Sequence, residues 1–364
     1  MAITKIEVPE LFDFGSDNSA FKLPTGTTAE RPSSPSNGEM RFNTTTGFVE
    51  YYDTTDVQWW EIDYEPVLVN VDYLLVAGGA GGSAELGGGG GAGGLLTNTF
   101  SFSPGDSFTL TLGAGAAGGS SYYGGEPYVN YNGVNSSISG SSITTLEAIG
   151  GGHPGNYFSG NGGPGNSGGS GGGAAMNVSS SNYWPGSSGG SGVSGQGFAG
   201  GDTSTYKTSG SAGVNTSAAG GGGGAGQAGE TPTAFVGGTG GDGVQSSITG
   251  VATYYAGGAS GWSGRANLPL PAGGLGGGGS SARGMTAAGS SVNTQATAGT
   301  ANTGGGGGSA RGWGAIPSQP GGSGVIILRL PTSSYTGTTT GSPTVTTDGT
   351  DTILIYTGSG TYTG

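Results

Sequence analysis

The sequence has no cysteine and only one histidine in 364 residues. The absence of cysteine excludes a disulfide framework and suits a chain assembled in a reducing cytoplasm. It also leaves only scattered carboxylates as metal ligands. Asp13 with Asp17, or Asp53 with Asp56, could hold Ca²⁺, but carboxylates in turns are more often simply solvated. We therefore expect no metal site and no cofactor.

Charged residues and long apolar runs are also scarce. Lys and Arg total 9 against 22 Asp and Glu, which gives a net charge of −13, and no basic cluster favours nucleic acid as a partner. No apolar run is long enough to insert into a membrane, and residues 1–14 lack the basic and apolar regions of a signal peptide. No heptad repeat predicts a coiled coil.

Catalytic patterns are weak. Any Ser-His-Asp triad would have to use His153, which lies in the turn sequence GGHPGN. The spacing G-x-S-x-G occurs at 165–169 and 186–190, as chance predicts in a chain so rich in Gly and Ser, and no strand–turn–helix context surrounds it. Glycoside cleavage needs two paired acids, and no spacing in the chain pairs them. We predict that the protein is not an enzyme; a polysaccharide depolymerase is the best enzymatic alternative.

Glycine is what the chain has in excess. It supplies 89 residues, far above its usual share of about 7%. The runs 87–91 and 304–308 break the three-residue period of collagen. A disordered linker would not need the β-branched and aromatic segments that interrupt the glycine blocks. These segments are 71–77, 99–112, 324–330 and 352–356.

Two arrangements could order the glycine blocks. Extended helices with three residues per turn, of the polyproline II type, could approach closely and satisfy one another's backbone groups. A β-sandwich with long glycine loops fits nearly as well. The predicted fold class is all-β with glycine-rich, polyglycine II-like segments, in which a small N-terminal β-meander precedes a glycine-rich, sandwich-like body. Within it, GGGGSSARG at 276–284 and GGGGSARG at 305–312 echo each other.

Four parts follow from composition. They are an attachment or linker segment at 1–28, a β-meander module at 29–70, a glycine-rich body at 71–330 and a C-terminal hairpin at 331–364. We expect the hairpin to close the body beside the strand at 73–76, with 358–363 as a last short edge.

The meander has clear strand and turn signals. Its strands are expected at 39–43, 48–52 and 57–62. Alternation places Met40 and Phe42 on one face of the sheet, with Val49 and Tyr51 across from them on the neighbouring strand. A meander this small needs something to pack against, either a partner subunit or the next domain.

The meander resembles a short module found in phage tail-fibre and other virion proteins. That module has an Arg-Pro pair, a Pro/Gly turn, an Arg-aromatic-Asn strand, a Thr-Thr-Gly turn, an aromatic strand and a Trp. The matching residues here are Arg31, Pro32, Pro35, Gly38, Arg41, Phe42, Asn43, Gly47, Phe48 and Trp60.

The body resembles the glycine-rich domains of phage tail-tip adhesins and related virion proteins. The resemblance is carried by the opening YLLVAGG, the block GGGGGAGG and the closing GSGVIILRL. Such domains consist of sandwiches of polyglycine II helices or of mixed β and polyglycine structure. The resemblance implies a structural bacteriophage virion protein, a fibre or fibre-like subunit involved in host attachment. It would be made in the host cytoplasm and located in a tail, neck or head fibre.

The same resemblance implies the partners. By analogy with fibres the chain would be a homotrimer, joined to other virion proteins through its N-terminal part. The alternative function is a receptor-binding adhesin that recognises a host surface glycan or outer-membrane protein.

Aromatic residues interrupt the Gly/Ser stretches. Exposed rings beside Ser, Gly and Asn make a good recognition surface, but we favour the alternative that they pack between glycine layers or across a subunit interface. Tyr183-Trp184 before Pro185 is the strongest candidate for an exposed loop tip. The candidate receptor contacts are Tyr157, Tyr183, Trp184, Tyr254, Tyr255 and Trp262.

Overall fold

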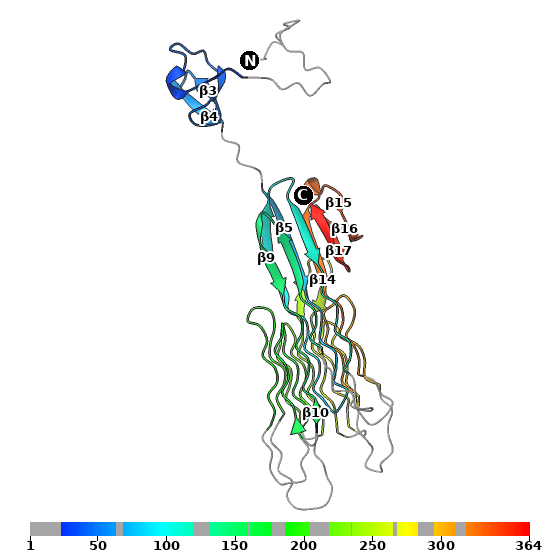
Figure 1. The fold of residues 1–364 in the computed structure, drawn as a ribbon. Helices are drawn as coiled ribbons and strands as arrows, with labels where there is room; N and C mark the ends of the chain where they lie inside the picture. The colour runs from blue at the N-terminus through cyan, green and yellow to red at the C-terminus, as the bar shows by residue number, and fades with distance from the viewer. Residues whose placement is uncertain are drawn as a thin grey trace, which may run out of the picture. The chain divides into compact units, whose positions relative to one another are not determined.

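The protein consists of two compact units, the first unit Met1–Pro66 and the second unit Val67–Gly364. The computed structural model describes residues 23–62, 68–119, 131–158, 161–176, 186–203, 218–233, 235–264, 268–282, 295–310 and 318–364. Within these ranges the regular elements are strands, apart from two short 3-10 helices (Figure 1). No helix there is long and apolar enough to cross a membrane. The predicted all-β class is confirmed.

The first unit is a four-stranded sheet in the order β1-β2-β3-β4. Its elements are β1 (Thr25–Gly26), the 3-10 helix η1 (Thr28–Glu30), β2 (Met40–Asn43), β3 (Phe48–Asp53) and β4 (Gln58–Ile62). β1 runs parallel to β2, and the other three strands form an antiparallel meander. Met40 pairs with Tyr51 and Phe42 with Val49, which confirms the predicted alternation. Gly47 closes the first turn with a φ of 80°, a conformation that favours glycine.

One part of the second unit is a sandwich of two five-stranded sheets. The first sheet has the order β16-β17-β14-β5-β6 and the second β15-β18-β7-β8-β9. The first contains β5 (Val69–Val76), β6 (Leu95–Phe102), β14 (Val325–Pro331), β16 (Thr344–Asp348) and β17 (Asp351–Tyr356). The second contains β7 (Ser107–Thr111), β8 (Ser136–Gly140), β9 (Ile143–Ala148), β15 (Thr338–Thr339) and β18 (Gly360–Thr363).

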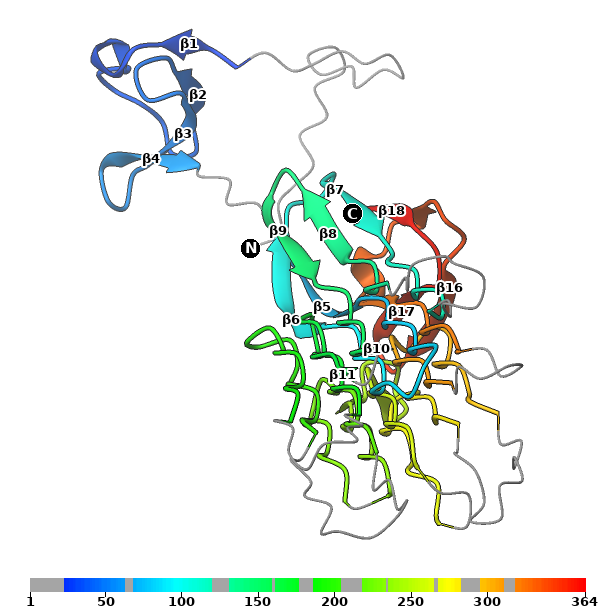
Figure 2. The ribbon, with the colours of Figure 1, turned by 60° about the horizontal axis from the view of Figure 1, so that its bottom comes forward.

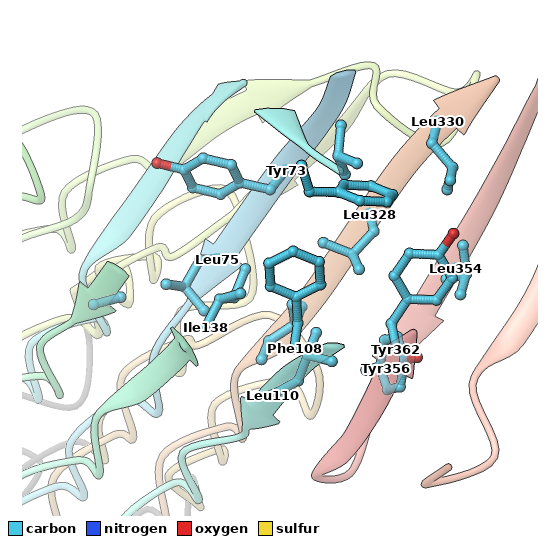
Figure 3. Packing of buried hydrophobic residues seen from close by; sticks show 14 of the residues in the cluster. Tyr73, Leu75, Phe108, Leu110, Ile138, Leu328, Leu330, Leu354, Tyr356 and Tyr362 are labelled. Atoms are coloured by element: carbon cyan, nitrogen blue, oxygen red, sulfur yellow. The ribbon is translucent and has the colours of Figure 1, made fainter. Parts of the chain in front are cut away.

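The inner faces of the two sheets form the main apolar core (Figure 3). Tyr73 and Leu75 of β5 point inward because side chains two residues apart share a face. They meet Phe108 and Leu110 of β7 across the layer, and all four are buried. The rings of Phe102 and Phe108 meet edge to face at a centroid distance of 5.4 Å. The outer face of the first sheet also has an apolar region, where Tyr255 packs with Leu74 and Val76.

The C-terminal strands take positions that the sequence did not predict. The hairpin of β16 and β17 forms, but β14 lies between it and β5, so the hairpin is not beside the strand at 73–76. β18 is not an edge, since β15 and β7 flank it in the second sheet. Both corrections have one cause: strand order depends on long-range pairing, which local patterns do not encode.

Below the sandwich, extended glycine-rich segments lie side by side (Figures 1 and 2). Four short strands accompany them: β10 (Tyr157–Phe158) with β11 (Asn161–Gly162), and β12 (Val244–Ser246) with β13 (Thr253–Tyr255). The last short element, η2 (Thr332–Ser334), follows β14. We call the array of glycine-rich segments the glycine lattice.

Segment 87–94 shows how the lattice is bonded. Successive amides donate to three neighbouring segments in rotation, so each neighbour is met again after three residues. Gly89 and Ala92 donate to Gly220 and Gly223, Gly90 and Gly93 to Gly307 and Gly304, and Gly91 and Gly94 to Gly152 and Ile149. Three residues per turn is the period of a polyproline II helix, which has no internal hydrogen bonds and therefore bonds outward.

The carbonyls of the same segment accept from three further segments. The donors are Gly173 and Ser170, Ala259 and Trp262, and Ala80 and Ala77. The N···O distances in both directions lie between 2.8 and 3.3 Å. Segment 87–94 is thus enclosed by six others, and the body contains both arrangements that the sequence allowed, a sandwich and a polyglycine II-like lattice.

Close packing explains why these positions are glycine. A Cβ at Gly88 would lie 2.0 Å from the carbonyl oxygen of Gly173. At Gly222 and Gly306 it would lie 2.1 and 2.0 Å from the carbonyl oxygen of Gly90. Cβ atoms do not approach carbonyl oxygens so closely, so steric exclusion, rather than an unusual φ, requires glycine at these positions.

Candidate interaction surfaces

One face of the first unit is an open apolar surface. The strand registers place Met40, Tyr51 and Trp60 in one row, and Phe42, Val49 and Ile62 in the next. Side chains of one face alternate along a strand, so the six lie together. Met40, Trp60 and Ile62 are each 42% exposed and Tyr51 is 36% exposed. We call these six residues the apolar face.

The opposite face buries charge. Glu50 is fully buried, and Arg31 Nη2 donates to its Oε2 at 2.5 Å. Asn43 Nδ2 donates to the same oxygen at 3.0 Å, and Arg41 Nε lies 3.4 Å from Oε1. Within 23–62 the buried residues are Arg41, Asn43 and Glu50, and no apolar side chain of that range is buried. A polar network therefore occupies the place of a hydrophobic core.

The network also ties down the segment before the sheet. Arg41 donates from Nη1 to the carbonyl of Glu30 at 2.8 Å and from Nη2 to that of Thr27 at 3.0 Å. The Thr27 amide donates to Glu30 Oε2 at 2.7 Å as half of a capping box, and this bond lowers the pKa of Glu30.

Two opposing effects act on the pKa of Glu50. Burial raises it, but hydrogen bonds from Arg31 and Asn43 and the two guanidinium charges lower it more, so the pKa ends below its ordinary value. Sequence reasoning missed this network, although its members Arg31, Arg41 and Asn43 are among the residues that carry the resemblance to the fibre module.

Two of the predicted receptor contacts are buried. Tyr255 is 7% exposed and packs on the outer face of the first sheet. Trp262 is 5% exposed and packs with Met176 and Ala219. Both side chains are packed inside the body, as in the favoured alternative that the rings lie between glycine layers. Glycine has no side chain to fill space, so these rings supply apolar contact between segments.

Of the other four predicted contacts, the structure describes the side chain of Tyr254. Tyr254 is half-buried and pairs with Gln245 in the β12–β13 hairpin. Tyr157 begins β10, but its side chain lies outside the described ones, as do both residues Tyr183 and Trp184.

A row of buried serines joins four neighbouring segments of the lattice. The amide of Ser83 donates to Ser309 Oγ at 2.9 Å, that of Ser309 to Ser281 Oγ at 2.8 Å, and that of Ser281 to Ser260 Oγ at 2.9 Å. Ser281 and Ser309 belong to the two echoing blocks of the sequence, so the echo places equivalent residues on neighbouring segments. This row links four lattice segments through side-chain oxygens in place of carbonyls.

A shallow hollow of about 440 Å³ lies over the first sheet, lined by Asp72, Thr97, Asn98, Thr99, Ser247, Ile248 and Arg329. Its charged groups already pair: Arg329 donates to Asp348 and Asp351 at 2.8 Å each, and Thr99 Oγ1 to Asp72. Among the residues that the structure describes, no three His, Asp or Glu side chains gather as metal ligands would.

Together, fold and contacts define a glycine-rich all-β protein whose body is ordered by backbone hydrogen bonds between extended segments. A family model described as a glycine-rich domain matches residues 54–331, and the chain belongs to this family. No curated protein and no solved structure matches the chain.

Proposed function

We propose that the chain is a structural, non-enzymatic subunit of a fibre-like bacteriophage appendage. It is made in the host cytoplasm, resides in the virion and takes part in host attachment. The first unit joins the chain to other virion proteins and to further copies of itself, as a homotrimer.

The observation that carries this proposal is the glycine lattice. A segment bonded to six others cannot bend without breaking hydrogen bonds on several sides, so the lattice is a stiff body. Stiffness without a large apolar core is what a projecting appendage needs, because it carries a contact surface away from its point of attachment.

The first unit gives independent support. Arg31, Arg41 and Asn43 match the fibre module and also build the network around Glu50, while Gly47 forms the turn. Four of the residues that carry the resemblance therefore help to determine this fold. A resemblance made of structural determinants favours a shared module over a chance match in composition.

Immunogold electron microscopy tests the proposal. An antibody raised against the purified chain is applied to phage particles whose genome encodes the chain, collected from a lysed culture. The same particles are analysed by mass spectrometry. We expect labelling of an appendage. Particles free of the chain, with all of it in the soluble lysate, would refute the proposal.

The second candidate function is a receptor-binding adhesin. The segments 177–185, 204–217 and 283–294 lie outside the described residues, but their sequences join lattice segments to one another, and the first contains Tyr183 and Trp184. Binding of the purified chain to host cells, reduced in Tyr183→Ala/Trp184→Ala but not in Tyr254→Ala, would favour it. Release of reducing sugar from the host envelope would indicate a depolymerase.

A further inference from the structure

Within residues 23–62, the apolar face has no cover from its own sheet. With six large side chains of which four are 36% to 42% exposed, its area is on the order of 400 Å². A patch of this size is in the range of the largest apolar patches on soluble proteins, which often mark interaction sites.

The second unit offers no matching surface in its described part. Its exposed large apolar residues come from separate segments, and only Val345 lies within a strand. They are Leu68, Tyr131, Val134, Val193, Phe198, Val251, Leu275 and Val345. No described sheet face there presents a row of exposed apolar side chains. Among the described residues, the surface that matches the apolar face in chemistry is therefore the same face on another copy.

Charge favours the same partner. The two rows contain no charged residue, while Arg41, Glu50 and Glu61 project from the opposite side of the sheet. Asp53, which follows Tyr51 on the same side, turns back to accept a hydrogen bond from the Thr55 amide at 2.7 Å. Copies that each carry a net charge of −13 repel one another, and a neutral face lets them meet with their charges turned outward.

We infer that the apolar face of each copy packs against the apolar faces of the other copies of the homotrimer. This deepens the proposed function, on whose homo-oligomer it rests, by naming the surface that joins the copies. Two such faces bury about 800 Å², less than the roughly 1,200 Å² of a stable interface. Association of the free chain is therefore reversible and depends on concentration, and attachment to neighbouring sites of one appendage strengthens it.

Sedimentation equilibrium of the full-length chain over a range of concentrations is the first test. The molar mass should rise from 34.9 kDa towards a multiple of it as concentration increases. Tyr51→Glu should weaken association by about tenfold or more, because it places a charge at the centre of the face. Tyr51→Phe should associate as the wild type does. Val251→Glu is the matched control, since Val251 is 68% exposed outside the face.

Cross-linking provides a second test that does not depend on a disruptive substitution. The chain has no cysteine, so a single introduced thiol reports on its own surroundings. Met40→Cys should form a cross-linked oligomer with a short bis-maleimide, whereas Val251→Cys should not. A wild-type chain that stays monomeric at every concentration, or association that Tyr51→Glu leaves unchanged, would overturn the inference.

The inference and the proposed function can fail separately. Self-association through the apolar face without any labelling of virions would refute only the virion assignment. Labelled virions together with a monomeric chain would refute the self-association and the homotrimer, and would leave the virion assignment standing.

Discussion

The two units of this protein reverse each other's arrangement of polar and apolar groups. The first unit buries Arg41, Asn43 and Glu50 and exposes its apolar side chains. The second unit buries apolar side chains in its sandwich and backbone amides and carbonyls in its lattice. A chain that is only 32% hydrophobic thus has two sources of order besides an apolar core: a charge network and a backbone lattice.

The difference predicts opposite sensitivities. The first unit depends on a few particular side chains, so removing one should weaken it. The lattice depends on the absence of side chains, so adding one should weaken it. Substitutions in one unit should leave the other intact if the two are independent folding units.

The largest effect is expected from Gly306→Ala. The new methyl group would lie 2.0 Å from the carbonyl oxygen of Gly90, and segment 87–94 cannot retreat because six segments enclose it. We expect the second unit to lose more than about 3 kcal/mol of unfolding free energy. Calorimetry, with hydrogen exchange of the peptides covering 87–94, measures this loss.

Gly358→Ala is the matched control, because nothing lies within 4 Å of its Cβ position. Its unfolding free energy should stay within about 1 kcal/mol of the wild type. Equal losses in both variants would mean that glycine is required for its backbone freedom and not for close packing.

A smaller effect, confined to the first unit, is expected from Glu50→Ala. The change leaves Arg31 and Arg41 without their carboxylate and should cost about 3 kcal/mol of that unit's unfolding free energy. Faster hydrogen exchange of residues 40–53, with unchanged exchange in the lattice, would show it. Glu61→Gln is the control, because Glu61 is exposed and pairs with Glu50 on the same face of the sheet.

The sequence predicted where strands and glycine-rich segments lie along the chain better than it predicted which of them pack side by side. Alternating segments such as 71–77 and 352–356 became strands. The composition of the glycine blocks left two arrangements open, three-per-turn helices or long loops on a sandwich, and the hydrogen bonds show the first. The order of lattice segments could not be predicted, because a glycine presents the same backbone groups to every neighbour. Side chains that bond to a neighbouring segment, such as those of Ser281 and Ser309, mark a particular register.

The candidate site was predicted in part. Alternation in the meander placed Met40, Phe42, Val49 and Tyr51 across from one another. The prediction stopped short of the apolar face as a whole, since Trp60 and Ile62 complete it only once β4 pairs with β3. Burial of Trp262 could not be deduced from a Gly/Ser context that suits an exposed loop equally well.

Alkaline pH should weaken the second unit. Tyr73, Tyr255, Tyr356 and Tyr362 are buried there, and burial raises the pKa of each phenol. Below about pH 10 these groups are protonated in both states, so their contribution is fully present. Above it the unfolded chain loses protons first, and the unfolding free energy falls as pH rises. Thermal unfolding of the second unit between pH 8 and 11 measures the slope.

Acid should weaken the first unit by the reverse argument, and this is the smallest of the expected effects. The pKa of Glu50 is lower in the folded state than in the unfolded chain. The carboxylate's contribution is therefore present above the unfolded value of about 4.3 and is lost as pH falls through the folded pKa. Hydrogen exchange of 40–53, corrected for intrinsic rates, should show this loss in the wild type between pH 5 and 3. Glu50→Gln, which has no proton to gain, should show a flatter profile, and an equally steep profile in that variant would assign the acid sensitivity to another carboxylate.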